Sequence, residues 1–244
     1  MEAIDAREAL GRNLTWGLCD ALGKSIVTGV YTGRAFPTEA ELAKQHNVSR
    51  TVTREAVKML TAKGLLSARP RQGTMIQPES HWNLFDSDVL GWLVERKFSL
   101  VLMRQFCELR KAIEPAAAEL AARAATAEGL ALIRACYQRL EAAERGDDYL
   151  PDADIAFHVS ILQASGNPFF ARCQELVRPA LLTSDKFMVR LQGRPVDLPG
   201  HKAVLDCIEA GDSAGARSAA EFLIQQVLMM VHRVEAQETG GQRS

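Results

Sequence analysis

Hydrophobic residues recur at helical spacing along most of the chain. Between about residues 13 and 29 they stand four apart, at Leu14, Leu18, Leu22 and Ile26, which is typical of a helix with one buried face. Strand-like runs occur only at 65–69 and 74–76. The pattern therefore predicts a mainly α fold with one short β ribbon. C-terminal helices are expected from Ser99 to Pro115, which ends or kinks the first of them, and over 126–144, 151–165, 168–192, 198–210 and 213–236.

The stretch from Pro37 to Lys63 predicts two short helices joined by a tight turn. Thr38 can cap the first helix, and Glu41 three residues later completes a capping box. His46 and Asn47 form the turn, because Asn tolerates the left-handed conformation that ends a helix. Ser49 then caps the second helix. Its predicted buried face consists of Val52, Ala56, Met59 and Leu60.

The opposite face of this second helix is basic, and a ribbon follows it. Arg50, Arg54 and Lys58 stand four apart, and the turn between the two strands contains Pro and Gly. A firmly held helix with a basic outer stripe suits the DNA major groove, although a charged face alone also fits simple solvation. The residues predicted to contact DNA are Ser49, Arg50, Thr51, Arg54, Lys58, Arg71, Gln72 and Gly73.

The net charge of −1 hides an uneven distribution. Residues 31–78 hold eight Lys or Arg against three Glu, whereas the chain from 79 onward holds 18 basic and 23 acidic residues. Only the first part suits a polyanion. The five cysteines are dispersed without a C-x-x-C pair, which is typical of a reducing cytoplasm. No apolar run approaches the ~20 residues that span a bilayer, and no signal peptide is visible, so we expect a cytoplasmic protein without membrane contact.

The N-terminal motifs resemble a known family. The order P-x-E-x-E-L-A, V-S-R-x-x-x-R-E-A-x-x-x-L, G-L and a late G-T resembles the winged helix-turn-helix of GntR-type bacterial transcription regulators. Where some members carry an Arg that reaches DNA, this chain has Ala40, so Arg50, Arg54 and the wing must carry more of the contact. We expect a DNA-binding domain over 10–78 and a linker with a short docking helix over 79–97. An all-α effector-binding and dimerisation domain is expected over 98–236.

Three residues of the helical region form a candidate metal site. Asp154 and His158 are four apart and so lie on the same side of one helix, and His201 opens a later helix. Asp, His and His suit Zn²⁺ or a similar divalent ion. An isolated Asp/His pair is more often only hydrogen-bonded, and His201 can equally be a surface residue. Spacing alone leaves both interpretations open.

A second resemblance adds to this pattern. The motifs E-L-R-K-A-I-E-P at 108–115, D-x-x-F-H at 154–158, S-G-N-P at 165–168 and H-K-A-V-L-D at 201–206 resemble the FCD-type effector domain of the FadR branch. This resemblance implies a divalent metal, with zinc the first choice, at Asp154, His158 and His201. The fourth family ligand is a His, but Leu223 stands at that position. The implied effector contacts are Arg110, Asn167, Asp154, His158 and His201.

The resemblance also bears on the effector. Arg110 matches a family position associated with an effector carboxylate, a task that suits its planar fork; without the family, an ion pair with Glu114 is as good an interpretation. The linker pattern W-N-x-x-D-x-D-V-L-x-W, together with Leu223, implies a sugar acid such as an aldonate. One winged domain offers one recognition helix, so we expect a symmetric homodimer on palindromic double-stranded operator DNA.

Two other functions fit the sequence less well. A metal-dependent hydrolase using Asp154, His158 and His201 lacks an evident general base and leaves the DNA-reading domain unexplained. A DNA-packing protein leaves the large acidic helical region unexplained. The sequence therefore favours a ligand-responsive transcription regulator, a repressor rather than an activator, and not an enzyme.

Overall fold

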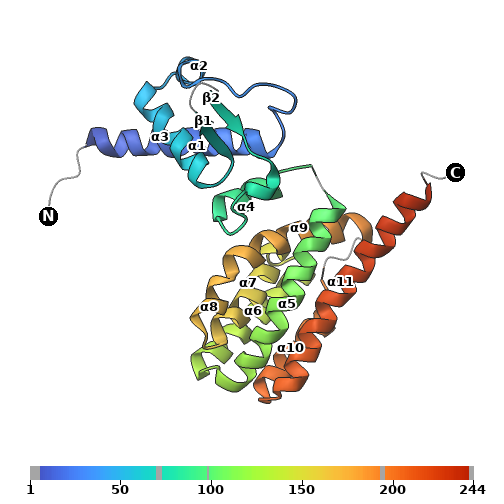
Figure 1. Ribbon diagram of the computed structural model, residues 1–244. Coiled ribbons are helices and arrows are strands. Elements are labelled where there is room, and N and C mark those ends of the chain that lie inside the picture. The colour runs from blue at the N-terminus through green and yellow to red at the C-terminus, as the bar shows by residue number, and fades with distance from the viewer. Residues whose placement is uncertain (1–5, 70–72, 98, 193–195, 242–244) are drawn as a thin grey trace. The chain divides into compact units, whose positions relative to one another are not determined.

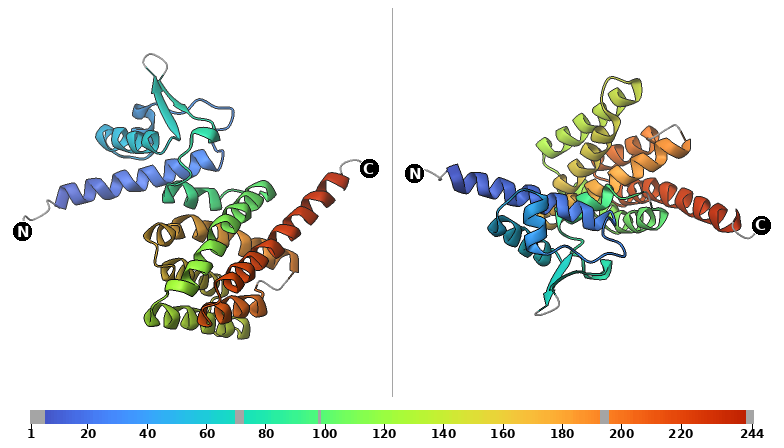
Figure 2. Two further views of the ribbon diagram at one scale, coloured as in Figure 1. Left: turned by 60° about the horizontal axis from the view of Figure 1, so that its bottom comes forward. Right: turned by 90° about the horizontal axis from the view of Figure 1, so that it is seen from above.

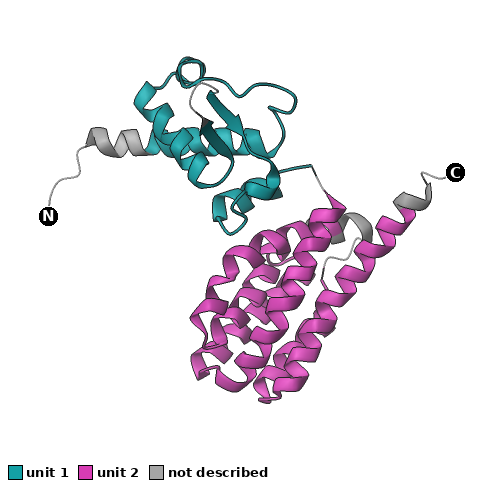
Figure 3. Cartoon of the chain, in the orientation of Figure 1, with its two compact units in different colours: residues 1–97 teal, residues 98–244 magenta. Residues whose placement is uncertain are grey.

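The computed structural model describes residues 6–69, 73–97, 99–192 and 196–241. The chain forms two compact units, residues 1–97 and 98–244 (Figure 3). The two predicted parts of the fold, an N-terminal winged helix-turn-helix and a C-terminal helical bundle, are both present. No helix among the described residues is long and apolar enough to cross a membrane.

The first unit is a helix-turn-helix with a two-stranded wing (Figure 1). The strands pair antiparallel, with Leu66 opposite Ile76. The predicted caps are confirmed: Thr38 and Glu41 form the capping box, Ser49 caps the second helix, and Asn47 has a φ of 52°. The elements are α1 (Ala6–Val27), α2 (Glu39–Gln45), α3 (Arg50–Ala62), β1 (Leu66–Arg69), β2 (Gly73–Ile76), η1 (Glu79–His81) and α4 (Ser87–Val94).

The buried face of α3 is turned relative to the prediction. The buried residues are Thr53, Ala56, Val57 and Leu60, whereas Val52 and Met59 are only half-buried. The prediction missed Thr53 because its hydroxyl is polar. The structure shows how that hydroxyl is accommodated, since it donates to the Ser49 carbonyl at 3.2 Å. The predicted basic residues of the helix, Arg50, Arg54 and Lys58, are all exposed.

Residues 79–97 belong to the first unit and are fastened to it by a polar and aromatic cluster. The ring of Trp92 lies against Gly23 of α1, where a Cβ would come within 2.3 Å of the indole. The indole N–H donates to Asp20 at 2.7 Å. Lys63, the residue that caps the end of α3, donates to Asp86 and Asp88 at 2.8 and 2.7 Å. α3 is therefore tied directly to the start of α4.

The second unit is a bundle of helices with two clusters of buried apolar residues. In Figure 2, α5 and α11 run alongside each other, and the two helices are in contact along the bundle. Large core side chains include Ile133, Leu140, Phe157 and Leu162. The elements are α5 (Leu100–Ala124), α6 (Ala127–Arg145), α7 (Leu150–Ala164), α8 (Pro168–Arg172), α9 (Gln174–Gln192), α10 (Leu198–Glu209) and α11 (Ser213–Gly241).

The predicted helices of this unit differ from the structure in two details. Pro115, which was predicted to end or kink its helix, does not end it, since α5 continues through it to Ala124. Proline removes one donor from the helix, and the buried side chains on both sides of Pro115 hold the backbone in place. The predicted helix over 168–192 is two helices, because the chain turns at Cys173 between α8 and α9. The sequence carries no Gly or Pro at that break.

Candidate metal centre and nucleic-acid interface

The basic side chains of α3 are available at its surface. Arg50, Thr51, Arg54 and Lys58 are all exposed. Arg54 Nε lies 3.5 Å from Glu39 Oε2, and Lys58 Nζ lies 2.8 Å from Glu55 Oε1. Such exposed ion pairs contribute little free energy, so phosphate groups can readily replace them. Ser49 is occupied as the helix cap, where its side chain accepts from the Val52 N–H at 3.2 Å.

The wing can be described only in part. Gly73 begins β2 with a φ of 79°, a backbone conformation that favours glycine at the tip of the ribbon. The other two predicted wing contacts, Arg71 and Gln72, lie outside the described residues. Their role in DNA binding stays a prediction.

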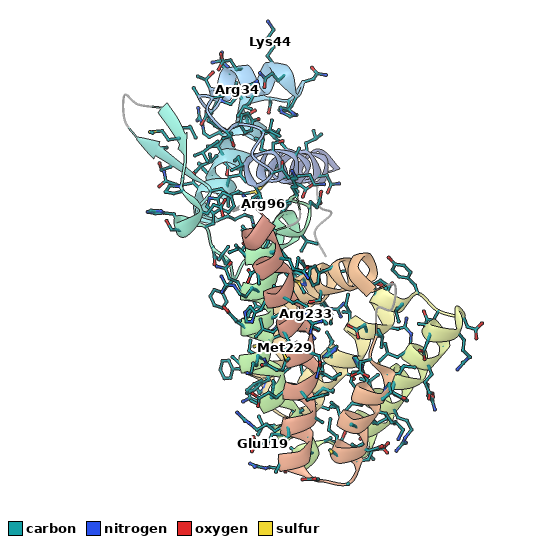
Figure 4. The ribbon with its side chains drawn as sticks, turned by 90° about the vertical axis from the view of Figure 1, so that its right-hand side faces the viewer. Arg34, Lys44, Arg96, Glu119, Met229 and Arg233 are labelled. Atoms are coloured by element: carbon teal, nitrogen blue, oxygen red, sulfur yellow. The ribbon has the colours of Figure 1, made fainter. Side chains whose placement is uncertain are left out.

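Two further basic residues of the first unit were not predicted as DNA contacts. Arg34 precedes α2, and Lys44 lies in its last turn. Both are exposed, and neither forms an ion pair with any described residue. Figure 4 shows both side chains at the end of the unit that carries α2. In helix-turn-helix proteins the first helix crosses the DNA backbone, so these cations are suited to phosphate contact.

The structure brings the three predicted metal ligands together in the core of the bundle. α7 carries Asp154 and His158, and the start of α10 carries His201. All three side chains are at most 7% exposed, and one potential ligand atom from each lies within 4.8 Å of the others. His201 Nε2 lies 3.0 Å from Asp154 Oδ1 and 3.3 Å from His158 Nε2. His158 Nε2 lies 3.8 Å from the same carboxylate oxygen.

The outer nitrogens of both imidazoles are already engaged. His158 Nδ1 lies 2.6 Å from Glu114 Oε2, and His201 Nδ1 lies 2.7 Å from the carbonyl oxygen of Asp197. Both partners only accept hydrogen bonds, so each Nδ1 carries a hydrogen, and each Nε2 offers a lone pair to a metal ion when its ring is neutral. Two lone pairs and a carboxylate oxygen therefore converge on one buried point. Metal-binding histidines in proteins are held in this way, so the residues fit a divalent ion.

The charges around the cluster determine which of its side chains are ionised. Burial by itself would raise the pKa of Glu114, but the charge of Arg110 and the contacts with His158 outweigh it and hold the pKa at about 2. The pKa of Asp154 is lowered too, because attraction to His158 and His201 overcomes the effect of burial. Burial opposes protonation of His201, yet its hydrogen bond to Asp154 raises its pKa. Two ionised carboxylates thus attract a cation to this point, whether a proton or a metal ion.

Leu223 lies beside the cluster, at the position of the missing fourth ligand. It is 7% exposed, and a Cβ on Gly200 would come within 2.5 Å of its Cδ2. A small cavity of about 10 Å³ is lined by Glu114 and His158 on its polar side and by Leu223 and other apolar residues elsewhere. This volume suits a single water-sized group. A larger ligand can therefore enter this cavity only if the bundle opens locally.

The two remaining predicted site residues, Arg110 and Asn167, have different contacts. Arg110 joins the cluster, since its Nη2 lies 3.5 Å from His158 Nε2. The alternative interpretation of Arg110 is also realised, because its Nε donates to Glu114 at 2.6 Å. Asn167 has another task, as its side chain accepts from the Phe169 N–H and caps α8. Its contact with an effector stays a prediction.

The sequence interpretation did not assign Glu114 to the site. The structure makes it the residue that holds both Arg110 and His158. Glu114 lies four residues after Arg110 on α5, so the i, i+4 ion pair was visible in the sequence. The contact with His158 was not, because it joins residues 44 positions apart on different helices.

Replacing Glu114 with glutamine is expected to lower zinc affinity by about 10- to 100-fold. The amide oxygen still accepts from His158, but it has no charge to balance Arg110 or to strengthen the imidazole as a ligand. Competition with a chromophoric chelator measures the affinity, and a melting curve checks that the variant is folded. Glu108→Gln is the matched control, since Glu108 is on the same helix and pairs with Arg104 at the surface. Equal zinc affinity in Glu114→Gln and Glu108→Gln would contradict this role.

Comparisons with known proteins agree with this geometry. Residues 15–76 match the family model for bacterial regulatory proteins of the gntR family, and residues 105–226 match the FCD domain. The Escherichia coli regulator YieP, an uncharacterised HTH-type transcriptional regulator, is 35% identical over 222 residues, which cover 89% of this chain and 95% of YieP. The galactonate operon transcriptional repressor of Escherichia coli is 32% identical over 215 residues, covering 87% and 94%. The solved structure of the Listeria monocytogenes protein Lar matches with a TM-score of 0.61 and 18% identity, over 90% of this chain and 96% of that one, which shows a common fold.

Proposed function

Because the chain belongs to the GntR family of bacterial regulatory proteins and carries an FCD domain, we propose that it is a repressor released from its operator by a small carboxylate. That it is a DNA-binding transcription regulator follows from the family itself, which consists of regulators and not enzymes. The alternative of a metal-dependent hydrolase is therefore dropped. The proposal concerns what the regulator senses, how it senses it and how it is assembled.

The observation that carries this proposal is the buried cluster of Asp154, His158 and His201. Two imidazole Nε2 atoms and a carboxylate oxygen meet in a bundle whose family domain is a regulatory one. A divalent ion there supplies a positive centre that attracts the carboxylate of an effector. Three protein ligands leave coordination positions open, and Leu223 does not fill them. Arg110 lies beside the cluster as a second cation.

The chemical class of the effector is proposed from the relatives. The similar Escherichia coli protein is named as the repressor of the galactonate operon, and galactonate is a sugar acid. A sugar acid has a carboxylate next to hydroxyl groups, which together can occupy two open positions on a metal. We assign this sensing to residues 98–236 and DNA reading to residues 10–78.

The regulator is proposed to act as a symmetric homodimer on a palindromic operator. Each copy offers one recognition helix, α3, and a two-fold pair presents two of them to matched half-sites. By linkage, an effector lowers DNA affinity only as far as it prefers the state that binds DNA poorly. The small cavity beside Leu223 means that effector binding must move parts of the bundle, which gives the effector such a preference.

A thermal-shift and gel-shift series tests this function. Zinc is expected to raise the melting temperature, and galactonate is expected to raise it further only in the zinc-loaded protein. The operator is first selected from genomic fragments with the metal-loaded protein. Galactonate should then release the protein from the operator. Other aldonates should release it to an extent that depends on how well each fits the site. An unchanged gel shift with every sugar acid, in the presence of zinc, would refute the proposed effector class.

A further inference from the structure

The guanidinium of Arg110 binds Glu114 along one edge and contacts Ser184 at its other end. Its Nε donates to Glu114 Oε1 at 2.6 Å, and its Nη2 lies 3.4 Å from Glu114 Oε2. These two contacts occupy the fork that would otherwise bind a carboxylate in a bidentate manner. Among the described residues, the remaining nitrogen, Nη1, contacts the hydroxyl of Ser184 at 3.4 Å. An anion that does not displace Glu114 can approach Arg110 at Nη1.

Ser184 is a buried hydroxyl whose acceptor among the described residues is a sulfur atom. It is 3% exposed, and its hydroxyl donates to the Met103 sulfur at 3.8 Å, beside the Cys107 thiol. Thioether sulfur is a weak acceptor. The neighbouring Thr183 differs, since its hydroxyl donates to the Pro179 carbonyl at 2.9 Å. Ser160 likewise donates to a carbonyl of its own helix, at 2.7 Å. Of these three hydroxyls, that of Ser184 can therefore donate its hydrogen to a ligand at the lowest cost in free energy, because it gives up only a weak hydrogen bond.

The charge of the described cluster selects among anions. With both imidazoles neutral, the carboxylates of Glu114 and Asp154 outweigh the guanidinium of Arg110 by one negative charge. A bound divalent ion changes the net charge of this cluster to one positive charge. Buried charge is costly unless it is balanced, so one negative charge balances the described cluster and a second has no partner within that cluster.

We propose that Ser184 Oγ and Arg110 Nη1 form an anion subsite that binds one carboxylate oxygen, and that the metal-loaded site takes monocarboxylates in preference to dicarboxylates. The two groups lie 3.4 Å apart, so one oxygen can accept from both at normal hydrogen-bond length. This inference rests on the proposed function, because it needs the metal to balance the charge. It adds Ser184 as a contact residue and sets the charge of the effector.

The first test replaces Ser184 with alanine and titrates the zinc-loaded protein with galactonate, gluconate and lactate by calorimetry. Ser184→Ala is expected to bind the acids that the wild type binds about 10- to 100-fold more weakly, because a hydrogen bond to a charged group is lost. Its zinc affinity and melting temperature should match those of the wild type. Thr183→Val is the matched control, since it removes the adjacent buried hydroxyl, and it should leave the binding of the acids unchanged.

The second test compares galactonate with galactarate, the dicarboxylate of the same chain length. The wild type loaded with zinc is expected to bind galactonate at least tenfold more tightly than galactarate. Equal binding of an acid by Ser184→Ala and the wild type would overturn the subsite while leaving the proposed function intact. Equal or tighter binding of galactarate would overturn the charge selection. Failure of the zinc-loaded wild type to bind any of these acids would overturn both this inference and the proposed effector class.

Discussion

Arg54→Ala is expected to abolish specific operator binding while leaving the helical content unchanged. Arg54 is exposed on α3, four residues from Arg50, and losing a bidentate base contact costs roughly 1–3 kcal/mol in each half-site. In the proposed symmetric dimer, the two half-sites multiply this loss. The change also frees Glu39, which lies 3.5 Å from the Arg54 Nε, to repel phosphate. Gel-shift titration on the selected operator and on unrelated DNA measures the loss of specificity, and circular dichroism checks the helices.

Two variants of the same helix separate base reading from charge. Arg54→Lys keeps the positive charge but not the planar fork, so it should retain the salt dependence of binding and lose discrimination between operator and unrelated DNA. Lys58→Ala removes a cation that is paired with Glu55, and it should weaken binding to both DNAs by a similar, smaller factor. Undiminished operator binding by Arg54→Ala would show that α3 does not read bases through this residue.

The elements of the fold were largely readable because their signals are local. Caps such as Thr38 and Ser49 act on N–H groups within three residues of themselves, so sequence spacing suffices to find them. Pro115 and Cys173 show the limit of local signals. A proline that normally breaks a helix lies inside one because its neighbours are buried, and a helix ends at Cys173 without a breaker. Tertiary packing decided both cases.

The sequence identified the candidate metal ligands but not the hydrogen bonds and ion pairs that connect them to other residues. The i, i+4 spacing places Asp154 and His158 on one face of α7, whereas His201 joins them only through the packing of α10. The ion pair of Glu114 with Arg110 was visible in the sequence, but the contact of Glu114 with His158 and the position of Ser184 were not. Their roles depend on which acceptor each nitrogen or hydroxyl meets, and those acceptors lie on other helices. Periodicity predicts which residues are buried, but not what polar groups they meet there.

His158→Ala is expected to abolish the effector response and leave operator binding intact. The change removes one of three ligands and leaves only Asp154 and His201, so zinc affinity should fall by more than the loss expected for Glu114→Gln. DNA binding depends on the first unit, which contains none of these residues. Zinc content by elemental analysis, operator binding by gel shift and release by galactonate are measured on the same preparation. A chelator added to the wild type should reproduce the loss of response.

His232→Ala is the matched control for this variant. His232 is an exposed histidine on α11, and its loss should change neither zinc content nor release of the operator. Loss of the buried His158 imidazole also removes packing against Phe157, so the melting temperature of His158→Ala is compared with that of chelated wild type. A folded His158→Ala protein that keeps stoichiometric zinc and is still released by galactonate would contradict the metal mechanism. The same conclusion follows if the wild type holds no metal and chelator leaves its response unchanged, because the effector would then bind a plain polar pocket.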